Sequence, residues 1–219
     1  MRADSPSRTV YCEEAIAWLR ARAELGGASV VTSLPDVSEL PALSLEDWRE
    51  WFIDAAGLIV SRVPASGAAI FYQTDIKRAG RWIDKSYLVQ KGAEQAGGHL
   101  LWHKIVCRVP AGQVTFGRPA YAHLLCFSRG LNAHPGRSTA DVLPDLGEMT
   151  WARAIGLKAC EVACRFVRDH TSTPTVVDPF CGVGTVLAMA NQMGLHAVGV
   201  DLSLKRVRRA RTLLAPSGI

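Results

Sequence analysis

One acidic residue and two glycines near the end of the chain form a pattern suited to holding a ligand. Residues 175–190, TVVDPFCGVGTVLAMA, contain a short apolar run, then Asp178, then Gly182 and Gly184, then residues typical of a helix. In α/β proteins, glycines after a strand let the backbone approach a ligand at the end of the sheet. Asp201 ends the next apolar run, where an acid can bind ribose hydroxyls. The pattern predicts a site for a ribose-containing ligand.

The charge of this segment limits the classes of ligand that it can bind. The string lacks the third glycine of the G-x-G-x-x-G pattern, and a carboxylate at Asp178 would repel a pyrophosphate group. A carboxylate there suits a cationic amine instead. S-adenosylmethionine carries a sulfonium, an α-amino group and a ribose, and it has no phosphate.

The segment resembles the cofactor-binding segment of class I S-adenosylmethionine-dependent methyltransferases. It is most similar to the amino-methylating DNA and RNA enzymes, whose signature is D-P-F-x-G-x-G-T. That signature is complete here, as Asp178, Pro179, Phe180, Gly182, Gly184 and Thr185. The resemblance implies that Asp178 lies near the methionine amine, that the glycines and Thr185 shape the turn under the cofactor, and that Asp201 holds the ribose. Phe180 either lines the same pocket or belongs to the core.

The late position of the glycine turn has a parallel in one branch of these enzymes, in which the catalytic half of the sheet precedes the cofactor half. Three segments stand here in the order of that branch. They are VVTSLPD, LLWHKIVCR and WARAIGLKACEVACRFV. The resemblance implies a circularly permuted single domain over residues 1–219. Its expected parts are a helical extension at 1–27, a catalytic half at 28–150 and a cofactor-binding half at 151–219.

The loop that ends the first expected strand departs from the family pattern. The amino methyltransferases usually carry D/N/S-P-P-Y/F/W there, and the aromatic side chain stacks on a flipped base. Here the loop reads Ser33, Leu34, Pro35, Asp36, so Ser33 and Pro35 match and Asp36 replaces the aromatic residue. Asp36 is either a catalytic group that orients or deprotonates the target or a turn residue. The expected position of the loop favours the catalytic interpretation.

Further candidates for substrate contact follow the next expected strand. Asp75 ends that strand and is either a substrate ligand or a strand cap. Lys77 and Arg78 follow, and they are candidates for phosphate contact, although a solvated loop is an equal alternative. The terminal run KRVRRAR is more typical of a solvated helical face than of a binding site.

The order of the predicted elements defines the fold class. Helical and strand patterns alternate, and several strands are apolar on both faces, which indicates an α/β protein with a mostly parallel Rossmann-like sheet flanked by helices. Two strands over 99–109 and 120–127 lack an intervening helix and predict an antiparallel hairpin at an edge. The segment from Ser7 to Gly26 predicts a helix.

Composition excludes some classes of protein and leaves others open. The chain has 219 residues, a net charge of +5 and a pI near 9.0, which is compatible with a nucleic-acid partner. No apolar run of membrane-spanning length is present, and a cytoplasmic location is expected. The six cysteines form no C-x-x-C pair, and no metal site is expected.

The predicted activity is methylation of a base amine or a hydroxyl in nucleic acid, with S-adenosylmethionine as the cofactor. The segment 130–150 is short for a recognition domain, which favours RNA, such as tRNA, over DNA. DNA, protein or small-molecule methylation and a catalytically silent cofactor-binding subunit are alternatives. The sequence also leaves a homodimer or a partner subunit open.

Overall fold

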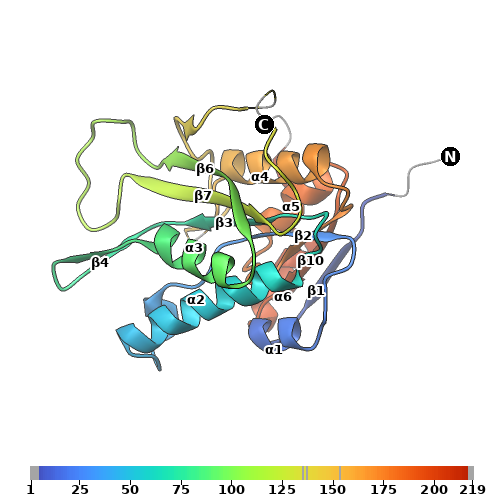
Figure 1. The fold of residues 1–219 in the computed structure, drawn as a ribbon, viewed down its shortest axis with the longest axis horizontal. Helices are drawn as coiled ribbons and strands as arrows, with labels where there is room; N and C mark the ends of the chain where they lie inside the picture. Colours follow the sequence, from blue (N-terminus) through green and yellow to red (C-terminus); the bar gives the residue numbers. More distant parts are fainter. Residues whose placement is uncertain (1–4, 135, 137, 153, 217–219) are drawn as a thin grey trace.

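The chain folds into a main twisted sheet that is covered by helices on both faces, with a small two-stranded hairpin beside it (Figure 1). The structure is a computed structural model that describes residues 5–134, 136, 138–152 and 154–216. The strands are β1 (Arg8–Tyr11), β2 (Ala28–Thr32), β3 (Ala69–Gln73), β4 (Ile76–Arg78), β5 (Arg81–Ile83), β6 (His99–Cys107), β7 (Tyr121–Ser128), β8 (Val142–Leu143), β9 (Thr175–Asp178) and β10 (His196–Val200). The helices are α1 (Ala15–Arg20), α2 (Leu45–Arg62), α3 (Lys85–Gln95), α4 (Leu157–His170), α5 (Thr185–Gln192) and α6 (Leu204–Thr212), with a 3-10 turn η1 at Val37–Glu39.

Eight strands form the main sheet in the order β1-β10-β9-β2-β3-β7-β6-β8. The first five are mutually parallel, β7 runs antiparallel to both β3 and β6, and β8 pairs parallel with β6. The predicted α/β class, the mostly parallel sheet and the antiparallel pair β6–β7 are therefore confirmed. The short strand β8, and not the β6–β7 pair, forms the edge.

Alternation along the central strands divides the core into two layers. Val31 and Ile70 face the layer that contains α4, α5 and α6, whereas Val30 and Phe71 face the layer that contains α1, α2 and α3. Neighbouring residues of a strand point to opposite faces, so strands that are apolar throughout are buried on both sides. No helix among the described residues is long and apolar enough to cross a membrane.

The topology reverses direction between β9 and β2. From β9 the chain continues through α5 to β10 on one side, and from β2 it continues through α2 to β3 on the other side. Val30 of β2 pairs with Val177 of β9 although the two residues belong to opposite ends of the sequence. In open α/β sheets, ligands bind beyond the carboxyl ends of the strands at such a switch point.

The N-terminal segment differs from the helix predicted between Ser7 and Gly26. Arg8–Tyr11 form the strand β1, which pairs with β10 at the sheet edge, and the helix α1 is short. Glu14 caps α1, because its carboxylate accepts hydrogen bonds from the backbone N–H groups of Ile16 and Ala17. The helical periodicity of this segment is a local preference, and the strand pairing that Arg8–Tyr11 form with β10 in the folded chain outweighs it.

Residues 76–83, for which the sequence allowed a solvated loop, form the small hairpin β4–β5, in which Ala79 and Gly80 have positive φ angles of 48° and 72°. Such a two-residue turn matches the twist of antiparallel strands. In the segment WARAIGLKACEVACRFV, the helix α4 begins at Leu157.

The helices α2 and α3 pack with backbone against backbone, so a larger side chain at this contact should destabilise the protein. A Cβ added at Gly92 of α3 would lie 2.2 Å from the carbonyl oxygen of Ile53 in α2. We expect Gly92→Ala to lower the free energy of unfolding by about 1–3 kcal/mol, because overpacking outweighs the gain in helix propensity. Gly26→Ala is the control, since a Cβ there meets no atom within 4 Å. Urea denaturation of both variants measures the difference, and equal stabilities would contradict the packing argument.

Candidate active site

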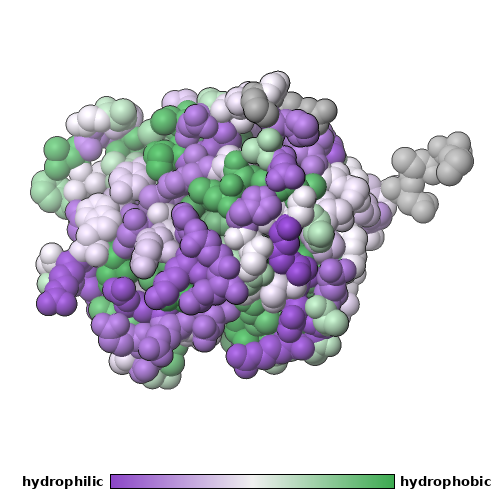
Figure 2. All heavy atoms as spheres, viewed as in Figure 1, coloured by the Kyte–Doolittle hydropathy of each residue, from purple (hydrophilic) through white to green (hydrophobic). Residues whose placement is uncertain are grey.

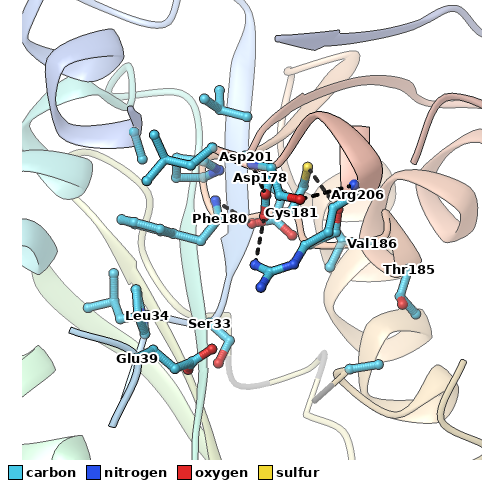
Figure 3. A pocket seen from close by; sticks show the side chains of 18 of the residues that line it. Ser33, Leu34, Glu39, Asp178, Phe180, Cys181, Thr185, Val186, Asp201 and Arg206 are labelled. Atoms are coloured by element: carbon cyan, nitrogen blue, oxygen red, sulfur yellow. Dashed lines mark hydrogen bonds and ion pairs between the residues drawn. The ribbon is translucent and has the colours of Figure 1, made fainter. Parts of the chain in front are cut away.

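A cavity of about 610 Å³ opens at the carboxyl ends of β9, β10, β2 and β1. Asp178 and the glycine turn form its floor, and the loop after β2 forms one wall (Figure 3). Trp51 of α2 and Trp151 before α4 contribute aromatic surface. The predicted cofactor residues and the predicted catalytic loop therefore lie at one cavity.

The glycine turn needs both of its glycines. Gly182 and Gly184 have φ angles of +55° and +90°, a region that L side chains rarely adopt. A Cβ at Gly182 would lie 2.9 Å from the Trp151 ring, and one at Gly184 would lie 2.9 Å from Ala210 in α6. The turn thus brings the backbone under the cavity and lets α6 pack closely behind it.

Asp178 is a buried carboxyl group at the switch point. Its side chain is 4% exposed and accepts hydrogen bonds from the Thr32 hydroxyl at 2.7 Å and from the Phe180 backbone N–H at 3.1 Å. Burial raises the pKa of Asp178 to about 7, against the effect of these two hydrogen bonds, and the nearby Asp201 carboxyl group adds to the rise. A positively charged ligand group at this position would favour the ionised form.

Asp201 directly follows β10, the strand beside β9, and lines the same cavity close to Asp178. Its carboxylate accepts a hydrogen bond from the Ser203 backbone N–H at 2.7 Å and lies 3.4 Å from the guanidinium group of Arg206. Figure 3 shows Arg206 extending from α6 toward these acids. The Arg206 guanidinium also lies 5.7 Å from the centre of the Trp151 ring. Arg206 therefore belongs to the site, although in the sequence it is part of an ordinary basic helix.

Phe180 and Thr185 of the D-P-F-x-G-x-G-T signature have different surroundings. Phe180 lines the cavity and makes an edge contact with Trp51 at a centroid distance of 6.1 Å. Thr185 is buried, and its hydroxyl lies 2.5 Å from that of Thr150. This contact ties the segment before α4 to the glycine turn.

The loop after β2 separates the cofactor cavity from a second chamber of about 250 Å³. Ser33 and Leu34 line both spaces, Pro35 lines only the larger one, and Asp36 lines only the smaller one. The Trp48 indole N–H donates to the carbonyl oxygen of Pro35 at 3.3 Å, which supports the loop from behind. The loop therefore lies between the two cavities.

Asp36 has two structural partners. It caps η1, since its carboxylate accepts from the Val37 N–H at 2.9 Å, and Glu39 completes a capping box. The same carboxylate lies 3.5 Å from the ammonium group of Lys85, which is 3% exposed. Burial holds the pKa of Lys85 below its ordinary value, although Asp36 opposes the decrease. The sequence offered Lys85 only as a possible phosphate contact beside Lys77 and Arg78, because one lysine at the start of a helix gives no local sign that it is buried against Asp36.

Asp75 connects four elements from a buried position. It is 2% exposed and accepts hydrogen bonds from His123 Nε2 at 3.0 Å, Trp82 Nε1 at 3.1 Å and the Lys85 backbone N–H at 2.8 Å. Burial raises the pKa of Asp75, but the hydrogen bonds from His123, the Lys85 backbone N–H and Trp82 together lower it by more, so the pKa lies below its ordinary value. Lys77 lines the smaller chamber, and Arg78 is exposed in β4.

The end of β1 contributes two acids that sequence reasoning missed. Glu13 and Glu14 line the large cavity beyond Asp201. Their position depends on the pairing of β1 with β10, which places the end of β1 beside the end of β10. In the sequence, the only sign of these site residues is that two acids directly follow a short β-branched run. The prediction of a helix for the whole segment hid this strand end.

The fold is shared with solved structures of DNA methylases. TTHA0409 of Thermus thermophilus, described as a candidate DNA modification methylase and solved with S-adenosyl-L-methionine, matches with a TM-score of 0.68 and 20% identity over 93% of this chain and 91% of that one. PvuII DNA methyltransferase, described as cytosine-N4-specific, matches with a TM-score of 0.71 and 14% identity over 98% and 90%. M1.HpyAVI in its SAM complex matches with a TM-score of 0.62 and 14% identity over 93% and 98%.

These likenesses define the class of fold. No family model and no curated protein matches the sequence. The chain has the class I S-adenosylmethionine-dependent methyltransferase fold that the D-P-F-x-G-x-G-T segment predicted.

The raised pKa of Asp178 predicts how stability depends on pH. The unfolded carboxyl group ionises near 3.8 and the folded one near 7, so the free energy of unfolding falls as pH rises between these values. Each pH unit corresponds to about 1.4 kcal/mol, so the fall is at most about 4 kcal/mol. We expect Asp178→Asn, without ligand, to remove this fall and to be more stable than the wild type at pH 8.

Denaturation at pH 4, 6 and 8 measures the effect. Asp145→Asn is the control of opposite sign, because the ion pair with Lys158 lowers the pKa of Asp145, and its stabilising contribution is lost as pH falls. If Asp178→Asn followed the wild-type pH profile, the assignment of the raised pKa would be wrong.

Proposed function

We propose that this protein is a methyltransferase that uses S-adenosylmethionine and methylates an exocyclic amine of a base in DNA. The observation that carries the proposal is the buried Asp178 carboxyl group at the switch point, facing a cavity beside the Ser33–Asp36 loop. Among the described residues, no lysine or arginine pairs with Asp178, so a cation from a ligand would complete its environment.

The donors and acceptors around the cavity suit the parts of this cofactor. Asp178 would accept a hydrogen bond from the methionine ammonium group. Asp201, which lies beside the Arg206 guanidinium group, would accept hydrogen bonds from the ribose hydroxyls. Glu13 and Glu14 lie one strand further along the same edge, where they would face the amine of the adenine ring. A pyrophosphate would meet carboxylates at each of these positions, which argues against a dinucleotide. When bound, the cofactor supplies an electrophilic methyl group on its sulfonium.

The residues between the two chambers would position the amine that receives the methyl group. Ser33 and Leu34 line both chambers, so a base in the smaller one would present its amine to the larger one across them. Asp36 lines the smaller chamber and would accept a hydrogen bond from the amine. It would then accept a proton from the amine as the N–C bond forms and the S–C bond to the methyl group breaks, which leaves the cofactor as a neutral thioether. The protein contributes mainly alignment of the reacting groups in this scheme.

The comparisons support DNA as the substrate at least as well as RNA. The short segment 130–150 favoured RNA because it leaves no room for a separate recognition domain. However, this chain spans 90–98% of the structures described as DNA methylases, so those chains also lack a large additional domain. The argument for RNA therefore has no support, and DNA is the proposed substrate.

Cofactor binding should depend on pH because Asp178 must be ionised to hold a cation. With a pKa of about 7, the ionised fraction rises about fifteenfold between pH 5.5 and pH 7, a range in which an α-ammonium stays protonated. We expect the affinity for S-adenosylmethionine to rise by a similar factor, and Asp178→Asn to bind weakly with a flat profile. Isothermal titration calorimetry at the two pH values measures this, and no binding by the wild type would contradict the proposed function.

Asp36 can be tested without disturbing its cap. Asp36→Asn keeps a good capping residue but removes the charge and the ion pair with Lys85, and we expect methyl transfer to fall by about 10²-fold or more with cofactor affinity unchanged. The assay follows labelled methyl groups into genomic DNA and, in parallel, into total RNA. Full activity of Asp36→Asn would exclude the catalytic role, and labelling of RNA alone would exclude DNA as the substrate. Glu46→Gln, which removes an exposed carboxylate at the start of α2 outside both chambers, is the control.

A further inference from the structure

Two hairpins project beside the smaller chamber. One is β4–β5, and the other is the long connection 108–120 between β6 and β7; both extend from the same side of the molecule (Figure 1). Ile76 and Lys77 from the first hairpin and Gly117 and Arg118 from the second line the 250 Å³ chamber. The two projections therefore frame the entrance through which a substrate would reach the Ser33–Asp36 loop.

Both projections carry positive charge without compensating acids. Residues 76–83 read IKRAGRWI and residues 108–120 read RVPAGQVTFGRPA, and neither segment contains Asp or Glu. Lys77, Arg78, Arg81 and Arg118 are exposed. Clustered cations of this kind suit a row of phosphates.

The longer projection also exposes large apolar side chains. Phe116 is 94% exposed and Val114 is 80% exposed. Trp82 of the other hairpin is 47% exposed, and the Lys77 ammonium lies 4.6 Å from the centre of its ring. In Figure 2 the upper projection at the left edge carries apolar atoms and the lower one carries strongly hydrophilic atoms. Aromatic rings interleaved with cations are the usual surface for exposed bases and their phosphates.

The hairpins are fixed in place by the buried Asp75. Its carboxylate binds Trp82 of β5 and His123 of β7, the strand that the longer projection enters. His123 in turn lies 3.0 Å from His103 of β6, the strand that the projection leaves. The base of the surface is therefore rigid, although its tips are exposed.

We propose that residues 76–83 and 108–120 form the DNA-binding surface of this protein, with Phe116 stacking on a base at the entrance to the smaller chamber, so that binding of the RNA duplex alone would contradict the proposal. Lys77, Arg78, Arg81 and Arg118 contact the phosphates on either side. The proposal rests on the proposed function, and it assigns to these hairpins the recognition that a separate domain would otherwise provide. It also supplies an aromatic ring for a site whose catalytic loop has none.

The test measures binding of a fluorescein-labelled 20-base-pair DNA duplex by anisotropy in the presence of S-adenosylmethionine. The single strand and the RNA duplex of the same sequence are run as parallel probes. Phe116→Ala should weaken binding of the preferred probe by about tenfold, as expected for the loss of one stacked base. Leu214→Ala, which removes another apolar side chain that is 81% exposed, should leave binding unchanged.

The charges are tested by salt dependence. Replacing Lys77, Arg78, Arg81 and Arg118 by Gln should reduce the slope of log affinity against log salt by about three, since each phosphate contact contributes about 0.7–0.9. The matched control replaces Lys205, Arg208 and Arg209 of α6 by Gln, and it should change the slope by less than about one. All of these side chains are exposed, so the variants should fold.

Several results would overturn the proposal. The proposal is wrong if Phe116→Ala binds as tightly as the wild type, if the salt slope falls as much in the α6 variant as in the hairpin variant, or if the protein binds none of the three probes. Calorimetry with S-adenosylmethionine separates this failure from that of the proposed function. A protein that binds the cofactor but no nucleic acid contradicts only the surface, whereas a protein that does not bind the cofactor contradicts the function itself.

Discussion

The pairing of β2 with β9 is the constraint on which the site depends. These strands come from the two ends of the sequence, yet they are parallel neighbours at the centre of the sheet. Each ends in a functional loop, Ser33–Asp36 after β2 and the glycine turn after β9, so both loops open at the same edge. The hydrogen bond from the Thr32 hydroxyl to Asp178 crosses this junction at 2.7 Å. The chain can therefore carry its cofactor segment late, because the junction requires the two strands to be adjacent and not their order along the chain.

The junction holds charged groups that the protein alone does not fully balance. Asp178 is buried, which raises its pKa, and no lysine or arginine within the described part of the chain pairs with it. Lys85 is buried at the first turn of α3, where the helix dipole also disfavours a cation. Asp36 balances Lys85 only in part, since the pKa of Lys85 remains lowered. Perturbed groups of opposite sign on either side of one loop are typical of a site in which ligand and substrate complete the electrostatics.

The sequence was sufficient where the signal was local. The glycine turn, the strands β2, β3, β9 and β10 and the helices α2 and α3 each carry their own pattern, and the structure contains all of them. The strand β1 was missed because its conformation depends on β10, almost the whole chain away. The burial of Asp75 depends likewise on His123 of β7. A polar residue at a strand end gives no local sign of whether it faces a substrate or a distant side chain. Arg206 was missed because only the fold turns α6 toward Asp201.

The substitution of the aromatic residue by Asp36 changes what the rest of the chamber must provide. The loop keeps its shape through contacts behind it, from the Trp48 indole to Pro35 and from Asp36 to the start of η1. Its front therefore presents a carboxylate and the Lys85 ammonium, which can bind the polar edge of a base but cannot stack on its face. Under the proposed function, stacking must then come from outside the loop, and the exposed rings of Phe116 and Trp82 belong to the two hairpins whose neighbouring residues line the chamber. The polar loop and the aromatic surface would then be complementary parts of one substrate site.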